Sequence, residues 1–312
     1  MKFAVNVIEA LLIVAIAPLV RGVIARVKAR IQNRRGASVL RPYADLLKLF
    51  RKEDLVPDTA SALFRFAPVV LFAVTVTAAA FVPVLHPSAL LGVSGDFIVL
   101  VYLLAAGRFF LMLGAMDGGS SFGGMGASRE ALVSTLAEAP LFLGLTSVAI
   151  LAHTVRLSGI VEFSVRQNPF QLSAVHVLAF GALALVAIAE TGRIPVDNPT
   201  THLELTMIHE AMVLEYSGPS LALIEWASAV KLTLIMALLV GVFVPWGMAT
   251  SNSLLGLAFA LLAFLFKFAV LAIVIAMIES SLAKLRMYLV PDFLGVASAL
   301  AILAVVFTAL MR

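Results

Sequence analysis

The sequence contains no cysteine and few charged residues, and each shortage excludes a class of protein. Without cysteine, the chain cannot form a disulfide, and it cannot supply the thiolates that hold an iron–sulfur cluster. Charged residues make up 13% of the 312 residues and hydrophobic residues 62%, a composition outside the usual range of soluble domains. If electrons pass near this chain, a partner protein must therefore carry them.

Motifs of nucleotide-binding and metal-dependent proteins are also missing. The glycine-rich stretch 117–130 lacks the GxxxxGK[ST] pattern of a phosphate-binding loop, and the residues after His209 do not complete HExxH. His153 and His176 lie at the outer edges of two apolar runs, and nothing pairs them as haem ligands. We therefore expect no catalytic residue, metal or cofactor in this chain.

Long apolar runs dominate what is present. A run of about 20 apolar residues can cross the hydrocarbon core of a bilayer as a helix. The sequence contains eight such runs, at about 3–24, 66–86, 97–116, 131–153, 173–192, 221–246, 254–279 and 293–311. The first run is too long, and too charged at its end, for a removable signal peptide. The sequence predicts an all-α polytopic membrane protein whose residues 1–312 form one integral membrane domain.

The basic residues predict the orientation of these helices. Eleven of the 22 lysines and arginines lie between Arg21 and Arg65, and four more lie in other loops on the same side. By the positive-inside rule these loops face the cytoplasm, so both termini lie outside the cell membrane. The net charge of +4 then reflects topology and contact with anionic lipid rather than nucleic acid.

Two loops on the predicted cytoplasmic side have informative patterns. After Pro42, apolar residues recur at helical spacing up to Phe50, opposite Asp45 and Lys48, which predicts an amphipathic helix at the membrane surface. A surface helix that only holds down the loop fits equally well. The stretch 117–130 predicts a loop, either a flexible connector or a docking surface for a partner.

The segment Glu190–Gly218 places five carboxylates and two histidines between two apolar runs. We expect part of it, about residues 200–216, to form a polar helical segment. Ionisable groups at membrane depth are costly and normally face protein or water, where they often function. Five acids so close together are expected to have coupled proton affinities.

Acids from several predicted helices could therefore converge into a proton relay inside the membrane. The predicted relay residues are Glu138, Glu190, Glu204, Glu210, Glu215 and Glu225. The predicted supporting charges are Arg108, Arg193, Asp197, Lys231 and Lys267. Lys231 and Lys267 lie deep in their helices and are expected to have partners on other helices, whereas Glu279 could reach the membrane surface. The alternative for each residue is a structural charge with a fixed partner.

Three stretches in one order carry a family resemblance. They are RPYADLLKLFRKED, FGGMGASREALVSTLAE and ETGRIPVDNPTTHLELTMIHEAMVLEYSG. Together they resemble the membrane subunit of group 4 nickel–iron hydrogenases of the formate hydrogenlyase and hydrogenase-4 type. That subunit is itself similar to subunit 1 of respiratory complex I. The resemblance extends over essentially the whole chain.

The resemblance implies a non-catalytic subunit that anchors a hydrophilic arm and couples its redox chemistry to ion movement. Its partners would be the hydrogenase large and small subunits, iron–sulfur proteins and antiporter-like membrane subunits. The nickel–iron centre and the iron–sulfur clusters would lie in those partners. The residues expected to dock the arm are Arg34, Arg35, Arg41 and Asp45.

Other functions remain open from the sequence. One is a quinone-site subunit of a complex I-like dehydrogenase, although Thr200, Thr201 and His202 stand where the complex I pattern is richer in acids. The second is a transporter that works alone, and the third is a passive anchor. The hydrogenase branch fits the motifs best.

Overall fold

Eleven α-helices and one short 3-10 helix, η1, account for most of the described chain. The computed structural model describes residues 2–92, 96–166, 173–198, 207–249 and 253–310. Within these ranges there is no strand, only an isolated bridge between Asp96 and Arg156. The all-α prediction is confirmed.

The apolar runs form the long helices. Seven helices are long and apolar enough to cross a membrane, and the eighth, α7, is apolar but shorter. Their bounds are α1 Lys2–Ile31, α3 Ala62–Ala79, α4 Phe97–Asp117, α5 Ser121–Ala152, α7 Ala174–Glu190, α9 Gly218–Phe243, α10 Leu254–Ser281 and α11 Val290–Leu310. Each of the eight predicted spans therefore has a helix.

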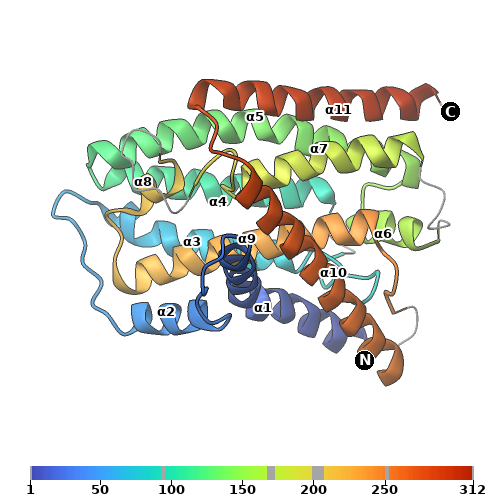
Figure 1. Ribbon diagram of the computed structural model, residues 1–312, viewed down its shortest axis with the longest axis horizontal. Helices are drawn as coiled ribbons and strands as arrows, with labels where there is room; N and C mark the ends of the chain where they lie inside the picture. Colours follow the sequence, from blue (N-terminus) through green and yellow to red (C-terminus); the bar gives the residue numbers. More distant parts are fainter. Residues whose placement is uncertain (1, 93–95, 167–172, 199–206, 250–252, 311–312) are drawn as a thin grey trace.

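Helix α9 is the centre of the bundle and α10 is at its edge. In α9, 78% of the apolar window is buried, compared with 22% in α10. Helices α1, α3 and α7 contact α9, whereas α11 packs on α5 and α7. Figure 1 shows α10 running obliquely across α1 and α9, away from α11. The last two long helices therefore lie on different sides of the bundle.

The predicted amphipathic helix is present as α2, Arg41–Phe50. Pro42 occupies its first turn, where a missing N–H costs nothing. Its apolar side lies against α1 and α9: the Tyr43 hydroxyl donates to the carbonyl of Ala15 (2.5 Å), and the Phe50 ring meets Trp226 edge-on at 6.3 Å. The helix is thus fixed to the bundle by both ends.

Two local predictions differ from the structure, and one helix was not predicted. Residues 121–130 are not a loop but the first turns of α5, because Ser120 caps the helix through the Gly123 N–H (3.1 Å) and Gly126 lets α8 approach closely. An additional short helix, α6, covers Leu157–Arg166. Within the described part of 200–216, the only helix is α8, His209–Val213, and residues 199–206 lie outside the described residues.

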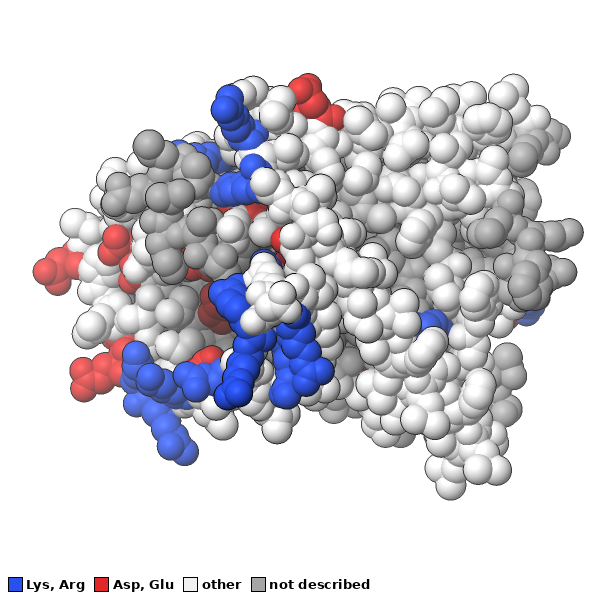
Figure 2. All heavy atoms as spheres, viewed as in Figure 1, with Lys and Arg blue, Asp and Glu red and all other residues white. Residues whose placement is uncertain are grey.

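Charge divides the bundle into two ends. Figure 2 shows most of the coloured charged atoms on its left half, around the connecting segments 32–61, 117–120, 191–198, 207–217 and 282–289, while the right half is nearly free of them. We call these the loop end and, where both termini lie in Figure 1, the terminal end. The placement of both termini at one end agrees with an even number of spans. Which end faces the cytoplasm stays a prediction.

A candidate proton-handling cavity at the loop end

A tight turn at the end of α7 holds Glu190 inside the bundle. Gly192 adopts a left-handed conformation (φ +57°), and the N–H of Arg193 returns to the carbonyl of Ile188 (3.0 Å), which ends the helix as a glycine C-cap does. Glu190, the last helical residue, has a fully buried side chain. The ETGR sequence therefore places a carboxylate inside the protein, while the arginine that follows the turn pairs with Glu279.

Glu190 is neutralised by two cations from neighbouring helices. Arg108 on α4 pairs with Oε1 of Glu190, and Nζ of Lys231 on α9 lies 2.9 Å from Oε2. Arg108 also donates to Glu138 on α5 (2.7 Å). The Arg108 side chain is 6% exposed, whereas that of Glu138 is 41% exposed. We call these four residues the Arg108 cluster, in which a buried arginine joins an interior acid to one at the lateral surface.

A second ion pair joins α1 to α9. Arg21 pairs with Glu225, and both side chains are only partly exposed. The prediction that the partner of Lys231 lies on another helix is confirmed, because Lys231 pairs with Glu190 of α7 and not with Glu225 of its own helix. We call this the Arg21 pair.

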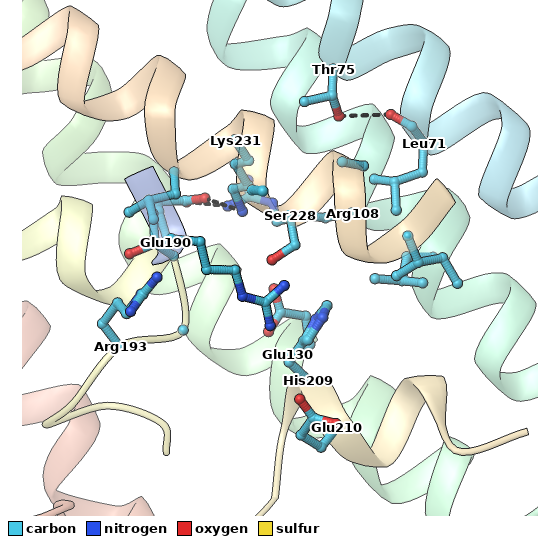
Figure 3. A pocket seen from close by; sticks show the side chains of 18 residues that line it. Leu71, Thr75, Arg108, Glu130, Glu190, Arg193, His209, Glu210, Ser228 and Lys231 are labelled. Carbon is cyan, nitrogen blue, oxygen red and sulfur yellow. Dashed lines mark hydrogen bonds and ion pairs between the residues drawn. The ribbon is translucent and has the colours of Figure 1, made fainter. Parts of the chain in front are cut away.

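A cavity of about 110 Å³ lies between these two groups. Side chains from α1, α3, α4, α5, α7, α8 and α9 line it (Figure 3). Its ionisable lining residues are Arg21, Arg108, Glu130, Glu190, Arg193, His209, Glu210 and Lys231. In Figure 3, Glu190 and Lys231 lie on one side, and Glu130, His209 and Glu210 lie on the other. Such a mixture of acids, bases and space suits proton exchange.

The loop after α7 forms one wall of the cavity, and ion pairs with residues of α10 and of the segment after it hold this loop in place. Asp197 is 3% exposed and accepts from Nζ of Lys284 (2.7 Å) and from the backbone N–H of His209 (3.1 Å). Glu279 binds both Arg193 (2.7 Å) and Lys28 (2.9 Å). The expectation that Glu279 reaches the membrane surface is therefore wrong, because its two cations hold it in the interior.

Some predicted relay residues lie elsewhere. Glu215 is exposed near Gly118, so the prediction that it converges with the interior acids is wrong. Lys267 donates to the carbonyls of Val244 (2.9 Å) and Trp246 (2.7 Å) near the terminal end, not to an acid of the relay. Glu204 lies outside the described residues.

The EYSG part of the motif has a structural role. Ser217 exchanges hydrogen bonds with the backbone of Leu55, and Gly218 (φ +46°) leaves room for the carbonyl of Glu53. Tyr216 stacks on Phe64 with ring centroids 4.1 Å apart, and burial and the nearby Asp117 and Asp54 raise the pKa of its hydroxyl. These residues fix the first loop against the start of α9.

The predicted docking residues are at the surface of the loop end. Arg34, Arg35 and Arg41 are exposed. Arg41 forms an exposed pair with Asp45 one helical turn away (2.9 Å), and such pairs contribute little to stability. These positions leave the arginines accessible to a partner.

The sequence pattern indicated another role for two lining residues of the cavity and did not single out a third. Arg21 contributes to the topology signal, His209 belongs to the incomplete HExxH pattern, and Glu130 was not predicted as a site residue. A sequence feature that could have identified such residues is an ionisable side chain within one or two turns of the end of a span, at the same membrane depth as an acid inside another span. Among the residues that the structure describes, no group of three His, Asp or Glu side chains is placed to hold a metal ion.

Comparison with known proteins decides the family. The protein-family model described as NADH dehydrogenase matches residues 3–309, nearly the entire chain. The chain belongs to the NADH dehydrogenase subunit 1 family. This family assignment confirms the resemblance to subunit 1 of complex I found in the sequence.

Within this family, hydrogenase subunits are among the relatives. The chain is 36% identical to formate hydrogenlyase subunit 4 of Escherichia coli, over 96% of each chain. It is 32% identical to hydrogenase-4 component C of the same organism, over 96% of this chain and 93% of the relative. An NADH-quinone oxidoreductase subunit of Solibacter usitatus is 31% identical, over 77% of this chain and 64% of the relative.

A solved structure has the same fold as this family member. A chain of the membrane-bound sulfane sulfur reductase, an archaeal respiratory membrane complex, superposes with a TM-score of 0.84. The match covers 97% of this chain at 23% identity, so it bears on fold alone. The protein is therefore a multi-span membrane subunit of the type found in hydrogenase and complex I-like assemblies.

Proposed function

We propose that this chain is the membrane-anchoring and coupling subunit of a membrane-bound hydrogenase of the formate hydrogenlyase type. In this proposal it lies in the cytoplasmic membrane with its loop end facing the cytoplasm and both termini outside. The loop end docks the hydrogenase large and small subunits, whose nickel–iron and iron–sulfur centres carry the redox chemistry. The full-length similarity to formate hydrogenlyase subunit 4 is the observation that carries the proposal.

The cavity at the loop end supports a coupling role. Arg108, which lines the cavity, pairs with both the fully buried Glu190 and the half-exposed Glu138, and so joins the interior to the lateral surface. A neighbouring membrane subunit could receive protons there. A passive anchor would not need a cation that links an interior acid to an acid at the lateral surface.

A quinone site in the cavity beside Glu190 is less well supported. The described cavity has about 110 Å³, whereas pockets for ligands of drug size usually have about 300–1,000 Å³. Its lining is rich in charge, while a quinone ring needs mostly apolar walls. The size and polarity of the cavity fit water and protons better than a quinone.

The docking role is tested by charge reversal on the assembled complex. Arg34, Arg35 and Arg41 are replaced together by Glu, and the hydrogenase subunits that co-purify with the tagged chain are quantified. We expect them to be lost. The control reverses Arg156 and Arg166, which lie on exposed parts of the terminal end, and should retain the subunits. Full retention in the triple variant would show that docking does not depend on these arginines.

The coupling role is tested in the complex reconstituted into vesicles. Glu190→Gln removes the charge that Arg108 and Lys231 share, and we expect proton movement per electron transferred to fall to background. Glu162→Gln, on an exposed turn of α6, is the matched control. Unchanged proton movement in Glu190→Gln would remove the cavity from the coupling path.

A further inference from the structure

The ion-paired acids around the cavity do not readily change protonation. Glu190 has two cationic partners, and Glu138 and Glu225 have one arginine each. A nearby cation favours the ionised form of a carboxylate. Proton movement between the Arg108 cluster and the Arg21 pair therefore requires an additional carrier.

His209 has the position that such a carrier needs. Its Nε2 atom is buried and has no hydrogen-bond partner in the described protein, and its side chain lines the cavity. Imidazole can both accept and release a proton near neutral pH. Buried polar atoms usually have a partner, so an unpartnered ring nitrogen facing a polar cavity points to water as that partner.

The backbone around His209 is fixed. The N–H of His209 is held by Oδ2 of the buried Asp197 (3.1 Å), and the carbonyl of Met207, two residues earlier, accepts from Arg129 (2.8 Å). Ile208 between them is 2% exposed. The imidazole therefore extends from a backbone position that hydrogen bonds fix at the beginning of α8.

Charged groups of both the Arg21 pair and the Arg108 cluster interact electrostatically with residues of the His209 side of the cavity. His209 interacts electrostatically with Glu225 of the Arg21 pair, and Glu210 does so with Arg21. Glu130 interacts in the same way with Arg108. The other polar residues that line the cavity with His209 come from every element around it: Arg21 of α1, Thr75 of α3, Arg108 of α4, Glu130 of α5, Glu190 of α7, Thr191 and Arg193 of the loop, Glu210 of α8, and Ser228 and Lys231 of α9.

The cavity has room for water between these groups. About 110 Å³ is sufficient for several water molecules, and Nε of Arg108 is a second buried nitrogen there without a protein partner among the described residues. Water can therefore bridge the Arg108 side and the Arg21 side through His209.

We propose that His209 is the proton-exchanging residue that connects the Arg108 cluster to the Arg21 pair. In the resting form, Nδ1 carries the proton and the Nε2 lone pair faces the cavity. Nε2 accepts a proton that arrives through cavity water from the Glu130 side, and the ring becomes an imidazolium. The same Nε2–H then releases its proton toward the Glu210 side, and the ring returns to neutral. One proton crosses, and no covalent bond between heavy atoms changes.

This inference rests on the proposed coupling function, and its test separates the two. The intact complex is reconstituted into vesicles, and proton movement and electron transfer are measured together with an artificial electron donor. The variants are His209→Gln, which keeps polarity but cannot carry a proton, and His209→Ala, which leaves space for added imidazole. The control is His153→Asn at the terminal end of α5, where Asn tolerates the left-handed backbone (φ +52°).

We expect both His209 variants to lose proton movement per electron by about 100-fold, the size of a general acid–base contribution, with electron transfer from the artificial donor unchanged. Millimolar imidazole should restore His209→Ala but not His209→Gln, an effect that a merely structural histidine would not produce. Wild-type coupling in His209→Gln, or failure of imidazole to restore an assembled His209→Ala complex, would overturn the inference. Absence of coupled proton movement in the wild-type complex would instead overturn the proposed function.

Discussion

Buried charges at the two ends of the bundle are satisfied in different ways. At the terminal end, the backbone serves as partner: Glu9, 2% exposed, accepts from the N–H groups of Val84 (3.3 Å) and His86 (2.9 Å), and Lys267 donates to two carbonyls after α9. At the loop end, Arg108 and Glu190 have other side chains as partners.

The difference separates structural from functional charge. Backbone partners have one geometry and cannot gain or lose a proton, so the charges at the terminal end hold loops and helix ends in place. Side-chain partners can rotate and titrate, so the pairs at the loop end can change with the state of a neighbouring protein. Burial alone does not distinguish the two, because Glu9 is as inaccessible as Glu190.

Replacing Arg108 by Met should have the largest effect. It leaves Glu190 and Glu138 without their shared cation, and breaking a buried ion pair costs about 3–5 kcal/mol. Thermal unfolding of the purified complex should measure this loss, and coupled proton movement should disappear. Arg65→Met, at an exposed position of the loop end, is the control and should change stability by less than about 0.5 kcal/mol.

Glu9→Ala should destabilise the protein by about 1–3 kcal/mol, because two buried backbone N–H groups lose their acceptor. Coupled proton movement per electron should stay at the wild-type level. Glu9→Gln retains an acceptor oxygen and should recover most of the stability in the same unfolding assay. Loss of coupling in Glu9→Gln would contradict the division of the molecule into a structural end and a functional end.

Lys267→Met should cost about 1 kcal/mol, since the carbonyls of Val244 and Trp246 lose a donor near the end of α9. Lys267→Arg should retain the donor and most of the stability. Both variants should move protons as the wild type does when assayed in vesicles. A coupling defect in Lys267→Met would return this lysine to the supporting charges of the relay, where the sequence first placed it.

Tyr216→Phe should have the smallest effect. The Tyr216 hydroxyl is buried and has no hydrogen-bond partner in the described residues, while its ring stacks on Phe64. Removing an unsatisfied hydroxyl while keeping the ring should change the free energy of unfolding by less than about 0.5 kcal/mol, or raise it slightly. Equilibrium unfolding of the two proteins in the same detergent measures the difference, and a clear loss would reveal a partner for this hydroxyl.

The fold was largely predictable because lipid imposes a simple rule. A spanning segment must be apolar and helical, so hydropathy located every long helix, and the pattern around Pro42 located α2. The start of α5 could not be predicted, since Gly123, Gly124 and Gly126 read as a loop in sequence. Gly123 lies against the carbonyl of Ala115 of α4 and Gly126 lies against α8, and only the tertiary structure supplies these close contacts.

The site was predictable in part. Glu138, Glu190 and Glu225 were identified because acids inside apolar runs are rare, and Arg108 and Lys231 were predicted as supporting charges. Which cation pairs with which acid was not predictable, because Arg108 meets Glu190 across 82 residues of sequence and Arg21 meets Glu225 across 204. The exposed Glu215 and the carbonyl-bound Lys267 show the converse error. The spacing of residues within a helix predicts which face of the helix a side chain lies on, but it does not predict which residue of a neighbouring helix lies opposite.

The segment that joins α10 to α11 also touches the loop after α7. The N–H of Leu285 donates to the carbonyl of Pro195 (2.8 Å), and Lys284 binds Asp197 beside it. Because α10 lies along α1 and α11 lies along α5 and α7, this short crossing ties the two flanks of the protein together over the cavity wall. A displacement of residues 193–197 by a docked protein would thus be transmitted to both α10 and α11 through this segment, without a change in the packing of α9.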